Sequence, residues 1–210
     1  LFERSVAECD LTVASIFVNP LQFAPTEDLA AYPRDLEGDA AAAEAAGVDW
    51  LFVPTVDEMY PEAVLTPVSV AGVSAAMEGA ARPAHFAGVA TVVAKLFNIV
   101  GPCRSYFGEK DFQQVAVVAR MVEDLSMPVE VVACPTLREP DGLARSSRNV
   151  YLGPAERAAA PVLHRALQAG ATAIAGGETD AEVVRRLMAG VVAAEPLAEV
   201  ADWVAGYRRF

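Results

Sequence analysis

Short apolar runs alternate with helical segments along most of the chain, and this alternation constrains the fold more than any other feature of the sequence. The runs typical of strands are 11–18, 50–53, 104–107 and 129–133, with a shorter candidate at 68–70. The segments with helical character are 36–46, 85–100 and 112–125. Short links between such elements favour parallel strands joined by right-handed crossovers. The sequence therefore predicts an α/β domain built on a parallel sheet.

The last part of the chain has a different character. An alanine-rich helix is expected from Pro154, a residue suited to a first helical turn, to the glycine pair that follows Ala175. A capping box at Thr179 begins a second helix, and 200–204 is a candidate strand. We therefore divide the chain into a larger domain, 1–152, and a smaller C-terminal domain, 153–210, which we expect to be incomplete.

The first residues, 1–8, have the character of a helix end that leads directly into the strand 11–18. A parallel sheet would place another strand before that helix, and the sequence shows none. From this pattern, and from Leu1 in the place of a methionine, we expect the natural beginning of the protein to lie upstream.

The charge and the composition argue against several classes of protein. A net charge of -12 does not provide the basic surface that nucleic acids require. No apolar run is long enough to span a membrane, and the charged start does not resemble a signal peptide. The three cysteines, Cys9, Cys103 and Cys134, lack the spacing of metal ligands and indicate a reduced, cytoplasmic setting.

Three polar loops follow strands of the predicted sheet, and they are 19–22, 108–114 and 136–149. In open sheets of parallel strands, ligands bind beyond the carboxyl ends of the strands. We therefore expect a binding site at the edge of the sheet where these loops meet.

The second loop places Lys110 at the start of a helix, whose apolar face is expected to contain Val115, Val118, Val122 and Leu125. Unpaired backbone N–H groups and the helix dipole attract anions to this end of a helix. A lysine is mildly unfavourable there unless an anion offsets its charge. Lys110 is therefore a candidate anion ligand, and the alternative is a solvated surface lysine.

The third loop contains two hydroxyls and a guanidinium in succession, at Ser146, Ser147 and Arg148. Such a set suits phosphate oxygens, because arginine binds them in a forked geometry and hydroxyls donate without adding charge. The alternative is an ordinary polar loop that caps a helix. Neither GxxxxGK[ST] nor GxGxxG occurs, so a nucleotide would have to be bound by another device.

Three segments together resemble the pantoate–β-alanine ligase (pantothenate synthetase) family, and they are 15–23, 106–114 and 138–149. Shorter pieces at 32–34, 58–61 and 82–86 agree in order and spacing, so the resemblance covers essentially the whole chain. It implies a Rossmann-like nucleotidyltransferase fold with a parallel sheet and a small, partial C-terminal domain.

The resemblance also implies the reaction. ATP activates pantoate as pantoyl adenylate and releases pyrophosphate, and the amine of β-alanine then displaces AMP to give pantothenate, a precursor of coenzyme A. It further implies Mg²⁺ with the ATP and a homodimer, whereas the cytoplasmic setting and the lack of a nucleic-acid or membrane partner are expected from the cysteines, the charge and the apolar pattern.

The resemblance assigns roles to twelve residues of this chain. The catalytic residues it implies are Lys110, Ser146, Ser147 and Arg148. The implied ATP-binding residues are Gly108, Glu109, Lys110, Asp111, Leu137, Arg145, Ser146, Ser147 and Arg148. The implied pantoate- and β-alanine-binding residues are Asn19, Gln22 and Gln114, and no residue is implied as a metal ligand.

The chain also departs from the family pattern. The family's His-x-x-His ahead of the first helix is absent from the sequence, which we expect to lack both that segment and the C-terminal end. Arg145 stands where an apolar residue is usual, and Ala24 and Ala84 stand where glycine is common. His85 lies near the expected pantoate pocket, or it serves only the helix start, and His164 is expected on the surface.

Two alternative functions remain open from the sequence. One is another nucleotidyltransferase that transfers a nucleotide to a phosphorylated acceptor. Gln22 and Gln114 argue against it, because a phosphate acceptor would favour arginine or lysine. The other is a truncated fragment without catalytic activity.

Overall fold

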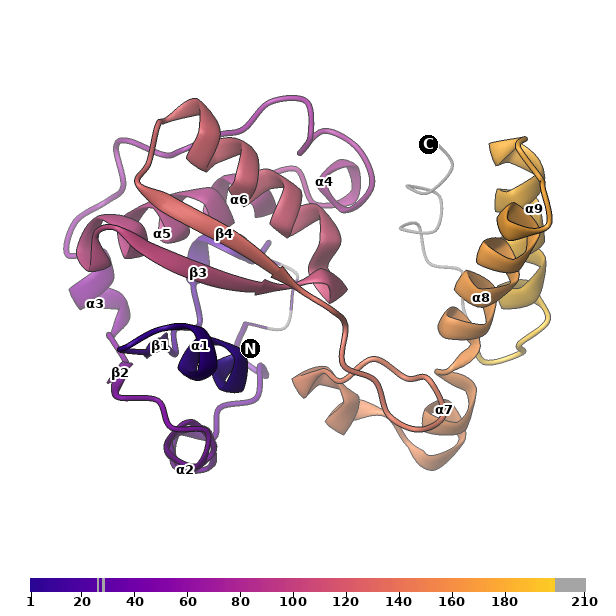
Figure 1. Cartoon of the computed structure of the whole chain (residues 1–210), viewed down its shortest axis with the longest axis horizontal. Coiled ribbons are helices and arrows are strands. Elements are labelled where there is room, and N and C mark those ends of the chain that lie inside the picture. Colours follow the sequence, from indigo (N-terminus) through magenta and orange to yellow (C-terminus); the bar gives the residue numbers. More distant parts are fainter. Residues whose placement is uncertain (26, 28, 199–210) are drawn as a thin grey trace. The chain divides into compact units, whose positions relative to one another are not determined.

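A computed structural model describes residues 1–25, 27 and 29–198, and the chain forms two compact units (Figure 1). The first unit contains 1–74 and 82–135, and the second contains 75–81 and the chain from Thr136 onward. The structure therefore groups 136–152 with the helices that follow, whereas the sequence suggested a boundary after residue 152. The candidate strand 200–204 lies outside the described residues.

The first unit contains two pairs of parallel strands, which confirms the α/β prediction. Strand β1 (Val13–Ser15) pairs with β2 (Trp50–Phe52), and β3 (Cys103–Gly108) pairs with β4 (Val129–Cys134). One continuous sheet was expected, but the two pairs share no hydrogen bonds within the described residues.

The expected strand 68–70 does not form. The Val68 N–H donates to Thr91 Oγ1 at 2.9 Å, so it bonds to a helix side chain and not to a neighbouring strand. The expected strand 11–18 is shortened to Val13–Ser15, although the Ile16 N–H continues the pairing to Phe52 O at 2.9 Å. Pro20, which has no N–H to donate, ends the extended segment shortly afterwards.

The core of the first unit lies between α5 (His85–Val100) and α6 (Phe112–Asp124), which pack against each other and, through α6, against β3 and β4. The shorter helices are α1 (Phe2–Glu8), α2 (Leu36–Ala45) and α3 (Val56–Met59), with one-turn 3₁₀ helices at η1 (Pro20–Gln22) and η2 (Glu109–Asp111). Nine residues of α5 are buried, which explains why its sequence is apolar on nearly every side.

The buried face of α6 differs from the predicted one. Its buried residues are Gln113, Val117, Val118 and Met121, whereas Leu125 is exposed. The spacing of the valines indicated a helix correctly, but the predicted buried face is rotated about the helix axis relative to the face that is buried. The reason is that Gln113, a polar residue, occupies a buried position that a search for apolar residues passes over.

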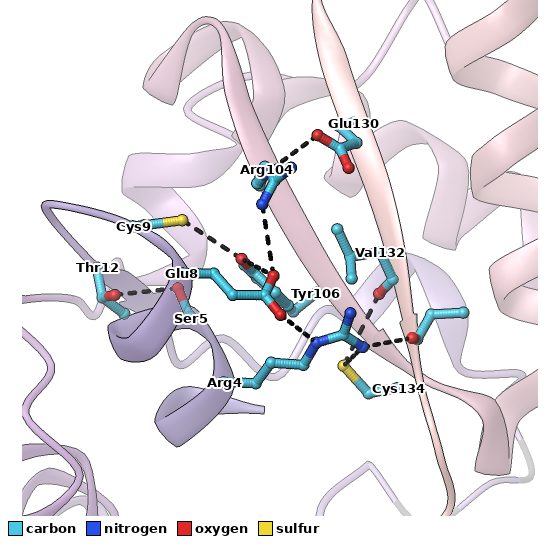
Figure 2. A network of polar contacts seen from close by, with 11 residues as sticks. Arg4, Ser5, Glu8, Cys9, Thr12, Arg104, Tyr106, Glu130, Val132 and Cys134 are labelled. Carbon is cyan, nitrogen blue, oxygen red and sulfur yellow. Dashed lines mark hydrogen bonds and ion pairs between the residues drawn. The ribbon is translucent and has the colours of Figure 1, made fainter.

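A polar network attaches α1 to the second strand pair, as Figure 2 shows. Arg4 Nε donates to Glu8 Oε1 at 2.7 Å, and its Nη1 donates to the Ala133 carbonyl at 2.9 Å. The Tyr106 hydroxyl donates to Glu8 Oε2 at 3.0 Å. The network therefore holds the last residues of β4, and the strand β3 that leads into Gly108, against α1.

We expect Glu8→Gln to lower stability modestly at neutral pH. Hydrogen bonds from Arg4 and Tyr106 hold the pKa of the Glu8 carboxyl below its usual range. A depressed carboxyl pKa stabilises the folded state above the unfolded pKa, and the stabilisation is lost as pH falls through the folded pKa. Thermal unfolding should therefore separate the variant from the parent at pH 7, and the difference should shrink below about pH 4.

A matched control is Glu44→Gln, since Glu44 is exposed on α2 and its side chain has no hydrogen bond within the described residues. This change should leave the unfolding temperature close to that of the parent at both pH values. An equal loss in the two variants would mean that the network adds nothing to stability.

The second unit is helical. Its helices are α4 (Glu78–Ala81), α7 (Pro154–Ala159), α8 (Val162–Ala175) and α9 (Ala181–Ala193), with a 3₁₀ segment η3 (Ser147–Tyr151). Helices α8 and α9 lie side by side, and Gly170 lets them approach closely at Met188 (Figure 1). The single helix expected from Pro154 is interrupted, because Pro161 cannot supply an N–H inside a helix.

None of the helices in the described part of the chain has both the length and the apolar character needed to cross a bilayer.

Candidate functional site

The carboxyl end of β1 leads to Asn19, a side chain that is only 1% exposed. Its Oδ1 accepts hydrogen bonds from the Leu21 N–H at 3.2 Å and from the Tyr60 hydroxyl at 2.9 Å. Its Nδ2 donates to Gln22 Oε1 at 3.0 Å and to the Gly88 carbonyl at 3.1 Å. Asn19 therefore joins the η1 turn to α3 and α5.

Gly88 allows α5 to pack directly on the η1 turn. A Cβ atom at this position would lie 2.2 Å from the Leu21 carbonyl oxygen and 2.7 Å from the Gln22 nitrogen. Both are backbone atoms and cannot rotate away, so only glycine fits. This close approach is what brings the Gly88 carbonyl within reach of the Asn19 amide.

Two side chains hold the backbone of Gln22. Its carbonyl oxygen accepts hydrogen bonds from Arg82 Nη2 at 3.0 Å and from His85 Nδ1 at 2.9 Å. A carbonyl can only accept, so His85 Nδ1 carries the proton. Arg82 also forms a two-point ion pair with Glu27, which holds the pKa of that carboxyl below its usual range. The structure thus gives His85 a role in fixing the η1 turn.

Lys110 lies in η2, immediately before α6. Its Nζ is 2.9 Å from Asp111 Oδ1 and 3.2 Å from Asp111 Oδ2, and it makes no other ion pair within the described residues. No side chain caps the first turn of α6. A lysine beside the start of a helix that has no side-chain cap is an arrangement that favours anions such as phosphate.

The adjacent glutamines of α6 differ in environment. Gln113 is 7% exposed and its Nε2 donates to the Val73 carbonyl at 2.9 Å. Gln114, the predicted substrate ligand, is half-buried, and its side chain makes no hydrogen bond within the described residues. Gln113 is a structural residue that the sequence analysis missed, although its spacing of four from Val117 was the available signal.

The predicted residues of the third loop lie in the second unit. Arg138 and Ala144 form an isolated antiparallel bridge, and Arg145 Nε pairs with Glu139 Oε1 at 3.0 Å. Ser146 Oγ accepts a hydrogen bond from the Arg148 N–H at 3.3 Å and so caps η3. The side chains of Leu137, Arg145, Ser147 and Arg148 are exposed, and Ser146 is half-buried.

His164 is not the simple surface residue that the sequence indicated. It packs beneath the turn at Gly142, which has a φ of +94° and where a Cβ atom would lie 2.1 Å from His164 Cδ2. Arg157 also pairs with Asp141, so two helices of the second unit hold this turn. These contacts explain why 136–152 groups with the following helices.

The structure therefore brings some of the predicted residues together. Asn19 and Gln22 are hydrogen-bonded to each other, and Lys110 is paired with Asp111. The segment Gly108–Asp111 belongs to the first unit and Arg145–Arg148 to the second. No cluster of three or more His, Cys, Asp or Glu residues suited to a metal ion occurs within the described residues.

Comparisons with known proteins agree on one family. A model of the family "Pantoate-beta-alanine ligase" matches residues 1–208. A pantothenate synthetase of Chloroflexus aggregans is 60% identical over 199 residues, which cover 95% of this chain and 72% of the relative. A pantothenate synthetase of Herpetosiphon aurantiacus is 58% identical over 204 residues, which cover 97% and 74%.

Solved structures match the fold as well. The crystal structure of pantothenate synthetase from Thermus thermophilus has a TM-score of 0.90 at 57% identity, covering 93% of this chain and 71% of that one. The pantoate-beta-alanine ligase of Francisella tularensis, in complex with beta-gamma ATP and beta-alanine, has a TM-score of 0.78 at 33% identity, covering 91% and 72%. These likenesses confirm the predicted fold class.

Proposed function

We propose, from the premise that this chain belongs to the pantoate–β-alanine ligase family, that its residues 1–152 carry the ATP and substrate contacts of an ATP-dependent, AMP-forming ligase. The observation that carries this conclusion is the family match over residues 1–208, at about 60% identity to pantothenate synthetases. It favours the ligase over another nucleotidyltransferase. Pantothenate, a precursor of coenzyme A, is the product.

The first step forms pantoyl adenylate. A carboxylate oxygen of pantoate attacks the α-phosphorus of ATP, and the bond to the β-phosphate oxygen breaks with release of pyrophosphate. Gln22 and Gln114 are assigned to pantoate, because neutral amides orient its carboxylate and hydroxyls without neutralising the nucleophile. Asn19 serves this site through Gln22, since its own amide is buried and fully hydrogen-bonded.

The ATP phosphates are assigned to the start of α6 and to the third loop. Lys110 and the uncapped N–H groups of α6 would stabilise the charge that develops on the phosphates in the transition state. In the second unit, Ser146, Ser147 and Arg148 are proposed as phosphate ligands that offer two hydroxyls and a guanidinium. The remaining proposed ATP contacts are Gly108, Glu109, Asp111, Leu137 and Arg145.

Magnesium is proposed to enter as part of the Mg²⁺–ATP substrate. An ion of this kind is held chiefly by phosphates and water, with few ligands from the protein. The Asp111 carboxylate beside Lys110 is the nearest acidic partner that the proposed phosphate site offers.

The second step forms the amide. The amine of β-alanine attacks the acyl carbon of pantoyl adenylate, AMP leaves, and the amine loses a proton. The Francisella tularensis relative, crystallised with beta-gamma ATP and beta-alanine, supports both substrates.

The direct test is a two-stage assay. Pyrophosphate release should require pantoate and ATP but not β-alanine, and AMP and pantothenate should appear only when β-alanine is added. Pyrophosphate release that ignored pantoate, or that required a phosphorylated acceptor, would overturn the proposed function.

We expect Gln22→Ala and Gln114→Ala to weaken pantoate binding by about tenfold or more while leaving ATP binding within about twofold. The reason is that each amide is half-buried and is assigned to pantoate alone. Isothermal titration with each ligand separately would measure both affinities. Gln168→Ala, on the exposed side of α8, is the matched control and should change neither. Equal losses for pantoate and ATP would assign these glutamines to the fold or to the nucleotide.

The proposed homodimer has a candidate surface. Leu65 is 91% exposed and lines a pocket of about 400 Å³, whose lining also includes Glu62 and Lys95. An exposed apolar side chain at a hollow that also carries charges of both signs suits a self-complementary contact. Sedimentation velocity would test whether the protein is a dimer.

The proposed cytoplasmic setting is supported by three cysteines that are all free.

A further inference from the structure

We infer that Tyr60 is a positioning residue for pantoate. Its hydroxyl holds the Asn19 amide, and Asn19 in turn holds the Gln22 amide. The N–H donors of Gln22 are thereby directed away from Asn19 and toward the substrate. The inference rests on the proposed assignment of Gln22 to pantoate. Tyr60 itself is not expected to touch the substrate.

The oxygen and nitrogen atoms of the Asn19 amide can be assigned from two backbone groups. The Leu21 N–H can only donate, so the Asn19 atom 3.2 Å from it is the oxygen. The Gly88 carbonyl can only accept, so the Asn19 atom 3.1 Å from it is the nitrogen. The assignment of oxygen and nitrogen therefore does not depend on the side chains around it.

The Tyr60 hydroxyl completes this arrangement. A side-chain amide has two N–H donors and two acceptor positions, and Asn19 uses all four, with Tyr60 filling the second acceptor position at 2.9 Å. Tyr60 lies at the C-terminus of α3 and packs against Phe17, with ring centroids 6.0 Å apart. Burial raises the pKa of Tyr60 to about 12, so the hydroxyl remains a donor throughout the neutral range.

The orientation of the Asn19 amide then determines the orientation of the Gln22 amide. Asn19 Nδ2 donates to Gln22 Oε1, so the Gln22 amide turns its oxygen toward Asn19. Its Nε2 makes no hydrogen bond within the described residues. Gln22 is therefore presented as a donor, which suits the carboxylate or hydroxyl oxygens of pantoate.

The Tyr60 hydroxyl helps to hold these orientations, because its hydrogen bond to Asn19 Oδ1 is shorter than the one from the Leu21 N–H. Without the hydroxyl, the buried oxygen would keep only the 3.2 Å contact from the Leu21 N–H. Rotation of the Asn19 amide would then become easier, and Gln22 would lose its fixed partner. A buried acceptor without a donor costs more than the bond itself contributes.

The test is Tyr60→Phe in the full-length protein, which removes one oxygen and keeps the ring against Phe17. The KM for pantoate should rise about tenfold, as expected for one lost hydrogen bond, while the KM for ATP stays within about twofold. Tyr106→Phe is the matched control, since its hydroxyl bonds to Glu8 in the α1 network and not to Asn19 (Figure 2). It should leave both KM values near those of the parent.

A double-variant cycle separates positioning from general stability. In a Gln22→Ala background, Tyr60→Phe should cause no further rise in the KM for pantoate, because Tyr60 acts through Gln22. Gln22→Glu should also weaken pantoate, since it replaces the free N–H group by a second oxygen. An equal effect of Tyr60→Phe on pantoate and ATP, or the same effect from Tyr106→Phe, would overturn the inference.

The outcomes distinguish this inference from the proposed function. If Gln22→Ala weakens pantoate but Tyr60→Phe does not, only the role of Tyr60 fails. If Gln22→Ala leaves pantoate unaffected, the pantoate assignment itself fails, and the positioning role fails with it.

Discussion

Lys110→Ala is expected to slow pantoyl adenylate formation by about 10²–10³-fold and to leave the fold intact. Removing a donor that stabilises developing charge costs about 2.7–4 kcal/mol in other enzymes. Lys110 is exposed and its only ion pair within the described residues is with Asp111, so its loss disturbs no core contact. Pantoate-dependent pyrophosphate release measures the effect, and the thermal unfolding temperature checks the fold.

Arg120→Ala provides the matched control for Lys110. Arg120 is an exposed cation on the same helix, α6, where it pairs with Asp124 one turn away. The substitution removes the same amount of charge without reaching the start of the helix, so turnover should be nearly unchanged. Near-normal turnover in Lys110→Ala, or an equal loss in Arg120→Ala, would mean that Lys110 is not the phosphate ligand.

Gly88→Ala is expected to lower both stability and pantoate affinity. In an ordinary helix interior, glycine to alanine is favourable by about 1 kcal/mol. Here the new Cβ would meet the Leu21 carbonyl oxygen at 2.2 Å, and overpacking of this kind typically costs about 1–3 kcal/mol. We therefore expect the cost of the clash to exceed the gain in helix propensity. The η1 turn that carries Gln22 must shift, so pantoate should bind about tenfold more weakly, or worse, by isothermal titration.

Gly190→Ala tests the same substitution where there is room. Gly190 lies on the exposed side of α9, and a Cβ atom there would meet nothing within 4 Å. Urea denaturation should show a gain of about 0.5–1 kcal/mol for this variant and a loss for Gly88→Ala. Opposite signs support the steric explanation. A gain in both variants would show that η1 and α5 are not held as closely as the structure indicates.

The elements that the sequence predicted well are those whose signals are local. The helix 85–100 was correct at both ends, because a long and mostly apolar segment ends at Gly101. The strands 104–107 and 129–133 were correct to within a residue at each end, because short apolar runs bounded by turns leave few alternatives. The turn with Lys110 at the start of a helix was also correct, since it follows directly from the order of those two elements.

The elements that the sequence misplaced depend on neighbours that are distant along the chain. The segment 68–70 has the composition of a strand, but the Thr91 hydroxyl takes its N–H group. The inner face of α6 includes Gln113 because the Val73 carbonyl lies where the Gln113 side chain can reach it. His164 is held by the turn at Gly142, which lies in an earlier loop, and not by its own helix.

The sequence by itself determined the α/β class, the family and the three loops that carry the candidate residues, because these follow from periodicity and from residue order. Only the tertiary structure decided how Asn19, Gln22 and Tyr60 are related. A buried amide takes its orientation from the donors and acceptors around it, and those come from Leu21, from α3 and from Gly88 on α5. Pattern along the chain carries no information about which of these groups meet in space.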